Sequence, residues 1–223
     1  MHWNYLKWKL PSKCREKIID KHTITECRHI NLVLQQSKKY EIFKLITENG
    51  REINIFCKGA TDYEMKMHRR IWNLVHGETR SAKVPKCFGF WKNKLFLEYI
   101  PYSITFEQFL SSNHSLEELE AILEQLGIFL AILHNNRIQH KDLNLNNILY
   151  STKTRTTYVI DFEISEENPV KTYLDSARDI FALKKHLTKH VGYTSTINAL
   201  SSSYNLETTY SELTTKWGDG FDG

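Results

Sequence analysis

The pattern of apolar and polar positions between residues 30 and 58 predicts three β-strands. The runs Ile30–Leu34, Tyr40–Ile46 and Glu52–Lys58 are rich in β-branched and aromatic residues, which favour strands. Glu48-Asn49-Gly50 supplies the residues of a tight turn between the last two runs. We therefore expect an antiparallel sheet in this part of the chain.

A helix and a second hairpin are predicted next. Thr61-Asp62-Tyr63-Glu64 has the pattern of a capping box, and the apolar spacing after it predicts a helix to about Val75. The strand-like runs Phe88–Trp91 and Lys94–Ile100 flank a Lys92-Asn93 turn. The sheet is therefore expected to resume after the helix.

A long amphipathic helix is expected to begin at Ser115 and to end near residues 134–136. Its apolar residues repeat at three- and four-residue spacing: Leu116, Leu119, Leu123, Leu126, Leu130 and Leu133. Such spacing indicates one buried face.

The remaining pattern predicts a hairpin and a more helical end. Strand-like runs at 148–150 and 157–162 bracket a turn at 151–156, and a helix is expected over about 176–190. Beyond it only weak helical periodicity remains. The predicted class is α+β, as one domain over residues 1–223 with lobes at about 1–98 and 99–223.

Composition describes an ordinary globular protein. The chain has 223 residues, 41% hydrophobic and 25% charged, enough to bury a substantial core. Its four cysteines form no CxxC pair, which argues against a zinc knuckle or a redox dithiol. The formal charge of +4 is mild and favours anionic partners such as nucleotides, nucleic acid or a membrane surface only weakly. No nucleic-acid partner is expected. The first residues lack an apolar leader, and the expected location is the cytoplasm.

The most informative string is HKDLNLNNIL at 140–149, followed by YVIDFE at 158–163. It resembles the catalytic loop HxDLxxxxN and the metal-binding DFG segment of kinases. Phosphoryl transfer to a hydroxyl needs a carboxylate for the acceptor and a metal site for the phosphates. Asp142 would be the acceptor-orienting base, and Asn147 and Asp161 would hold Mg²⁺. ATP and Mg²⁺ are therefore the expected cofactors.

Residues upstream complete the kinase-like set. Lys58 ends a predicted strand, and Glu64 lies one turn into the following helix, like the lysine–glutamate pair that positions ATP phosphates in kinases. The segment Glu98-Tyr99-Ile100 resembles the hinge that binds adenine. Asp179 resembles the helix aspartate that braces the catalytic loop. The resemblance implies a minimal bilobal protein-kinase-like fold, with a small antiparallel-sheet lobe and a mainly helical lobe.

Several positions depart from regulated protein kinases. No GxGxxG lies between the first two strands, where Lys38 or Lys39 could help to cover the phosphates. Glu163 replaces the glycine of DFG, and Asn144 stands where many protein kinases carry a phosphate-contacting lysine. The segment from Asp161 to the helix aspartate is short and contains no APE-like motif. A peptide-docking activation segment therefore fits poorly.

These departures point to a narrower resemblance. The strings IQHKDLNLNNILY…YVIDFE and ARDIFALKKHLTKHVG, together with the Glu64 helix followed by KVPKCFGF, are similar to kinases of the bacterial lipopolysaccharide core. The resemblance extends over roughly residues 52 to 192 by motif order. It implies transfer of phosphate from ATP to a Kdo or heptose hydroxyl of a glycolipid at the cytoplasmic face of the inner membrane.

Other interpretations remain open at this point. The chain could be a minimal Ser/Thr or Tyr protein kinase, such as a secreted bacterial effector, with a protein substrate. A small-metabolite phosphotransferase usually has a larger helical subdomain than the 62 residues after Asp161. A pseudokinase module would lack a catalytic element, and none is missing here. The aromatic and basic residues 3–17 could contact a membrane surface or pack on the small lobe, and His186 and His190 are expected to be solvated.

Overall fold

A computed structural model describes residues 24–35, 38–47, 50–167, 173–188 and 195–207. The chain divides into two compact units, which are described separately. The first comprises the described residues within Met1–Arg69 and Pro85–Ile100, and the second those within Arg70–Val84 and Pro101–Gly223.

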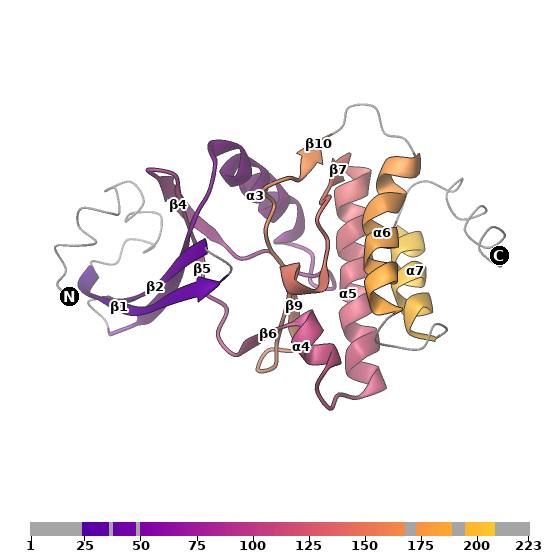
Figure 1. The fold of residues 1–223 in the computed structure, drawn as a ribbon, viewed down its shortest axis with the longest axis horizontal. Coiled ribbons are helices and arrows are strands. Elements are labelled where there is room, and N and C mark those ends of the chain that lie inside the picture. The colour runs from indigo at the N-terminus through magenta and orange to yellow at the C-terminus, as the bar shows by residue number, and fades with distance from the viewer. Residues whose placement is uncertain (1–23, 36–37, 48–49, 168–172, 189–194, 208–223) are drawn as a thin grey trace. The chain divides into compact units, whose positions relative to one another are not determined.

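A five-stranded antiparallel sheet forms most of the first unit. Its strands run in the order β1-β2-β3-β5-β4 (Figure 1), with bounds Ile24–Gln35, Lys38–Thr47, Glu52–Gly59, Lys94–Glu98 and Cys87–Trp91. The predicted sheet is confirmed, although β1 begins earlier than the apolar run indicated. Gly50 has a φ of 75°, a conformation that suits glycine in a turn.

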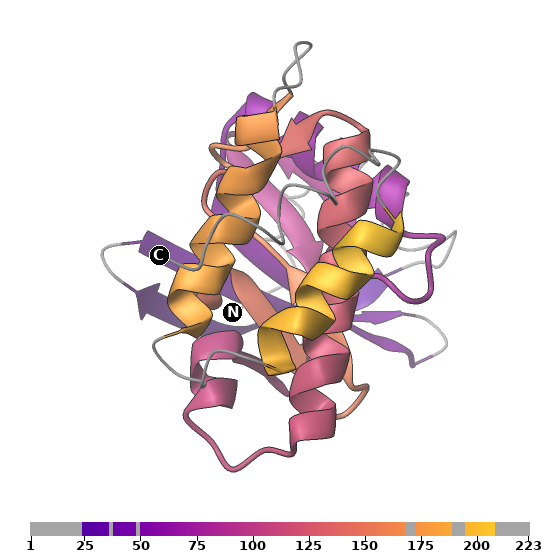
Figure 2. The same cartoon turned by 90° about the vertical axis from the view of Figure 1, so that its right-hand side faces the viewer.

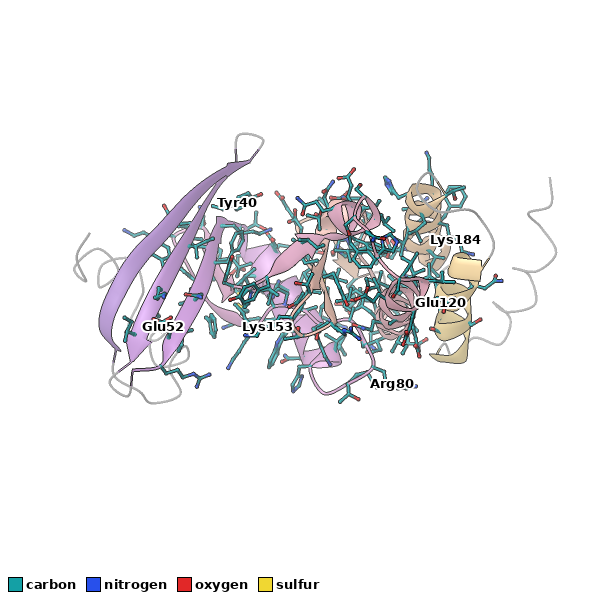
Figure 3. All side chains as sticks on the ribbon, turned by 90° about the horizontal axis from the view of Figure 1, so that it is seen from below. Tyr40, Glu52, Arg80, Glu120, Lys153 and Lys184 are labelled. Carbon is teal, nitrogen blue, oxygen red and sulfur yellow. The ribbon has the colours of Figure 1, made fainter. Side chains whose placement is uncertain are left out.

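Side chains on the two faces of this sheet have different environments. Phe43, Leu45 and Ile55 are fully buried on one face. Tyr40 stacks on Phe56 of the neighbouring strand at 5.2 Å between ring centroids. Figure 3 labels Tyr40 and Glu52, both on this sheet. Buried side chains alternate with more exposed ones along β2 and β3, which is typical of strands with one buried face.

Helix α3 (Asp62–Val75) links the two units in sequence. It begins where predicted, because the Thr61 hydroxyl accepts a hydrogen bond from the Glu64 amide at 3.1 Å and so satisfies an end-of-helix donor. Its buried face contains Met67, Ile71 and Val75. The predicted helix is confirmed.

The second unit is built around α5 (Leu116–Asn135). Ser115 forms a capping box with Glu118 at its start, and the apolar face predicted from the leucine spacing is largely buried; Leu116, at the exposed first position, is the exception. Among its described residues, this unit also contains the helices α4 (Phe106–Leu110), α6 (Tyr173–Leu187) and α7 (Ser195–Glu207).

Short strands in the second unit frame the loop that follows α5. One sheet has the order β6-β8-β9, and a second pairs β10 with β7. Their bounds are Ser103–Thr105, Ile148–Ser151, Thr156–Val159, Glu166–Glu167 and Ile138–Gln139. The β8–β9 hairpin was predicted, but its second strand ends at Val159, because Asp161 has a φ of 67° and leaves the extended region.

Helix α7 crosses α5, and α6 lies along the same side of α5 (Figure 2). The sequence predicted only weak helicity for α7, which contains Ser201-Ser202-Ser203. The helix packs on α5 at Gly127, where an added Cβ would lie 2.6 Å from the Leu200 carbonyl oxygen. Packing therefore overrides a poor local propensity.

Some sequence predictions concern residues outside the described ranges. The basic and aromatic segment 3–17 and His190 fall there, as do the side chains of Lys38 and Lys39. Among the described helices, none has the length and apolarity required to cross a membrane.

Candidate active site

The loop between β7 and β8 carries the predicted acceptor base. It ends in the 3₁₀ helix η1 (Leu145–Asn147), which leads directly into β8. In the hairpin, Ile148 pairs with Val159, and the Ile160 amide donates to the Asn147 carbonyl at 3.0 Å. This register brings Asn147 and Asp161 to the same end of the hairpin.

The Asp142 carboxylate is held on both oxygens. Asn144 Nδ2 donates to Oδ1 at 3.1 Å, and Asn147 Nδ2 donates to Oδ2 at 3.0 Å. Asn147 Nδ2 also donates to the Asp142 carbonyl at 2.9 Å. Asp142 is exposed, so its remaining lone pairs can accept a bond from a hydroxyl group.

His140 fixes the backbone beside Asp142. Its Nε2 lies 3.1 Å from the Ile160 carbonyl, which requires a donor, and its Nδ1 accepts from the Asp142 amide at 3.3 Å. Both bonds are satisfied by a neutral ring protonated on Nε2. Burial lowers the pKa of His140 below its usual value, which is consistent with the neutral ring. The ring also packs against the buried Phe162.

Asp179 of α6 braces the same loop, in the role that the sequence resemblance implied. Its two oxygens accept the amides of His140 at 2.8 Å and Lys141 at 2.9 Å. Burial alone would raise the pKa of Asp179, but the hydrogen bonds that it receives from His134 and from the His140 backbone act in the opposite direction, and the pKa lies below its usual value. Asp179 therefore stays ionised and stabilises the left-handed backbone at Lys141, whose φ is 67°.

His134 and Tyr204 extend this network to α7. His134 Nε2 lies 3.1 Å from Asp179 Oδ2, and its Nδ1 lies 3.1 Å from the Tyr204 hydroxyl. Both residues are buried. Sequence reasoning missed these contacts, since His134 and Tyr204 are 70 residues apart and no motif marks either residue.

The segment after Asp161 is tied back to the catalytic loop. The Ser165 hydroxyl donates to the His140 carbonyl at 3.1 Å. On β10, Glu166 pairs with Lys141, and Glu167 pairs with Arg70 at 2.6 Å. These two ion pairs are substantially exposed and individually contribute little to stability, but both attach β10 to its surroundings.

Lys58 and Glu64 meet in the first unit. Lys58 Nζ lies 2.6 Å from Glu64 Oε1, with side chains only 11% and 1% exposed. The sequence allowed Glu64 to be merely a capping residue, yet its carboxylate is the partner of Lys58. Buried ion pairs contribute modestly to net stability because desolvation of the two charges opposes their attraction.

One turn further along α3, His68 is a buried residue that the sequence did not single out. Its Nε2 donates to the Pro85 carbonyl at 2.7 Å. Burial, together with the nearby positive charge of Lys58, lowers its pKa to about 4 despite that hydrogen bond. The ring is therefore neutral at pH 7, and it fastens α3 to the segment that precedes β4.

The predicted hinge lies at the end of β5. The Tyr99 amide donates to the Asn54 carbonyl at 3.2 Å, and the Glu98 amide donates to the Lys86 carbonyl at 2.9 Å. These two donors are thus engaged within the first unit. Adenine binding by Glu98, Tyr99 and Ile100 stays a prediction, in which backbone groups of this segment would contact the base.

The donor set of the hairpin end suits Mg²⁺. The amide nitrogen of Asn147 is engaged by Asp142, so the group that Asn147 can offer a cation is its amide oxygen, and Asp161 adds a carboxylate. Mg²⁺ prefers such hard oxygen ligands, completed by water and phosphate. Within the described ranges, no cluster of three or more His, Cys, Asp or Glu residues forms an all-protein metal cage.

Comparison with known proteins identifies the family and the fold. Residues 81–204 match the model of the lipopolysaccharide kinase (Kdo/WaaP) family. The solved structure of the Cydia pomonella granulovirus kinase PK-1 superposes with a TM-score of 0.51 and 19% identity, over 82% of this chain and 69% of that one. The predicted kinase-like fold is confirmed.

Curated relatives are also kinase-related. A probable serine/threonine-protein kinase, fnkB, of Dictyostelium discoideum is 34% identical over 58% of this chain and 26% of its own length. The EKC/KEOPS complex subunit bud32 of the same organism is 26% identical over 54% of this chain and 49% of its own length. The matches thus span about a quarter and about half of these relatives.

Proposed function

The chain belongs to the lipopolysaccharide kinase (Kdo/WaaP) family, and from this premise we propose that it is an ATP-dependent phosphotransferase acting on a core-sugar hydroxyl. The observation that supports the proposal most strongly is the Asp142 carboxylate, fixed on both oxygens inside the family-matching segment. A side chain held in this way is suited to orienting an acceptor.

In the proposed reaction, Asp142 accepts the hydrogen bond of the acceptor hydroxyl and directs its oxygen at the γ-phosphorus. The new O–P bond forms as the bond to the β,γ-bridging oxygen breaks, ADP leaves with that oxygen, and the hydroxyl proton passes to Asp142 and then to solvent. Positioning is expected to supply much of the rate, because phosphoryl transfer leaves little covalent chemistry to the protein.

Asn147 and Asp161 would hold Mg²⁺, which when bound neutralises charge developing on the phosphates. Lys58 would contact the ATP phosphates, with Glu64 fixing its ammonium group, in the role that the paired residues have in kinases. In the proposal, backbone groups of Glu98, Tyr99 and Ile100 would bind the adenine edge of ATP.

A glycolipid acceptor is presented at a membrane surface, so the proposal includes peripheral contact with the inner membrane from the cytoplasm. Anionic headgroups attract lysine and arginine side chains, and the basic residues of segment 3–17 are available in the sequence for such contact.

A protein hydroxyl is the second candidate acceptor. It is favoured by the 34% identity to a relative named as a probable serine/threonine-protein kinase. The short segment between Asp161 and α6 argues against it, because peptide substrates of kinases dock on a longer activation segment.

The acceptor can be tested with γ-labelled ATP and Mg²⁺ in parallel reactions. One contains core glycolipid carrying Kdo and heptose in anionic vesicles, and the other contains histone and casein. We expect label in the glycolipid, absent when Asp142→Asn replaces the wild type. Labelling of protein alone would transfer the assignment to the protein-kinase alternative, and no transfer in either reaction would contradict the proposed activity.

A further inference from the structure

Asn144 contacts Asp142 in a way that the kinase-like motif does not specify. The motif requires Asp142 and Asn147, whereas the position two residues after the aspartate carries a phosphate-contacting lysine in many protein kinases. Here that position is an asparagine whose Nδ2 lies 3.1 Å from Asp142 Oδ1 and 3.3 Å from the Asp142 carbonyl oxygen. Asn147 engages the other carboxylate oxygen at 3.0 Å. The carboxylate is therefore held from two sides.

The orientation of the Asn144 amide is determined by its neighbours. Its Oδ1 accepts the backbone amides of Asn146 at 3.0 Å and Asn147 at 3.2 Å, as the N-cap of η1. Backbone N–H groups require an acceptor, so the oxygen must face η1 and the nitrogen must face Asp142. One side chain thus connects the start of η1 to the reacting carboxylate.

We propose that Asn144 is a positioning residue, which sets the orientation of the Asp142 carboxylate for the acceptor hydroxyl. This inference rests on the proposed phosphotransfer function. With one N–H on each oxygen, rotation of the carboxylate would break at least one hydrogen bond. The lone pairs that remain are therefore presented in one direction, which is the condition for a productive angle of attack.

The capping and positioning roles can be separated by substitution. Asn144→Asp keeps an oxygen for the amides of η1, and aspartate caps helices as well as asparagine does. It replaces the donor beside Asp142 Oδ1 with a second negative oxygen. Asn144→Ser also keeps a capping oxygen, but it lacks the amide donor and adds no charge.

The two roles lead to different kinetic results. If Asn144 only caps η1, both variants should transfer phosphate like the wild type. Positioning predicts that Asn144→Asp lowers kcat by about 10- to 100-fold and Asn144→Ser by a smaller factor, with KM for ATP unchanged. Asn146→Asp is the matched control: it adds the same charge two residues away on an exposed side chain and should keep kcat near the wild-type value.

A structural readout makes the inference testable apart from the activity. In ¹⁵N NMR spectra recorded without nucleotide, the side-chain amide signals of Asn144 and Asn147 should both shift in Asp142→Ala relative to the wild type. An unmoved Asn144 signal, or wild-type kcat in Asn144→Asp, would overturn the positioning role. A wild-type protein without any phosphotransfer would contradict the proposed function instead, and the NMR result would still decide whether Asn144 holds Asp142.

Discussion

Buried histidines take specific hydrogen-bonding roles around both sets of candidate residues. His68 donates to a backbone carbonyl near the Lys58–Glu64 pair, and His140 connects the backbone of Asp142 to Ile160. Removing such a ring from water favours its neutral form, and in both cases the pKa is lowered. A proton on the buried His68 ring would add positive charge near Lys58, so protonation of this ring should oppose folding at low pH.

His68 leads to a prediction about stability and pH. Its folded-state pKa of about 4 lies below the ordinary value of 6.5, so between these values the unfolded chain binds more protons. The contribution of neutral His68 is therefore complete above pH 6.5 and is lost as the pH falls toward 4. His68→Gln keeps a donor for Pro85 but does not titrate. Between pH 7 and 5, the wild type should lose about 2 kcal/mol more unfolding free energy than the variant.

Urea denaturation at the two pH values measures this difference. His76→Gln, an exposed histidine just after α3, serves as the control and should follow the wild type. Parallel losses in the wild type and in His68→Gln would show that His68 does not couple folding to pH.

Residues of the candidate site differ in how far the sequence could predict them. Asp142, Asn147 and Asp161 are close in sequence and have characteristic spacing, so their loop and hairpin could be predicted. His68, by contrast, bonds to a residue 17 positions away, and Tyr204 to one 70 away. Such contacts depend on how elements pack, which local spacing does not encode.

At the scale of elements, the close contact between α5 and α7 is connected to the catalytic loop through hydrogen bonds. Gly127 lets the backbone of α7 approach, and Tyr204, near the end of α7, then reaches His134 on α5. Through Asp179, this contact continues to the amides of the loop. A displaced α7 would therefore remove one support of the loop.

Gly127→Ala tests that packing. Alanine favours a helix by about 1 kcal/mol over glycine, but overpacking typically costs about 1–3 kcal/mol. The new Cβ would lie 2.6 Å from a backbone oxygen and 2.9 Å from Ser203 Cβ, so α7 itself must move. The cost of overpacking should therefore exceed the gain in helix propensity. We expect a lower thermal midpoint for the variant.

A matched substitution separates packing from propensity. Gly77→Ala meets no atom within 4 Å and should leave the midpoint unchanged or slightly higher. A Gly127→Ala protein as stable as the wild type would show that α7 does not pack closely at this position.

The elements that the sequence predicted well are those with long periodic patterns. The leucine spacing of α5 and the apolar runs of β2 and β3 carry their own signal. The two-residue strands β7 and β10 and the serine-rich α7 do not, because pairing partners or packing stabilise them. The local sequence pattern therefore predicts an element only where the element is long enough to show a regular apolar face.

At the scale of the whole molecule, the candidate residues fall in both compact units. The Lys58–Glu64 pair belongs to the first, and Asp142, Asn147 and Asp161 belong to the second. The family and the kinase-like fold are established by comparison. The central claim is that Asp142 contributes to turnover in the proposed phosphotransfer rather than to nucleotide binding.

Turnover and Mg-ATP affinity of Asp142→Asn test this claim most directly. The amide keeps the size of the side chain but accepts a proton poorly, so kcat for phosphotransfer should fall by about 100-fold or more, while calorimetry gives a dissociation constant within about twofold of the wild type. Wild-type turnover in this variant would contradict the account.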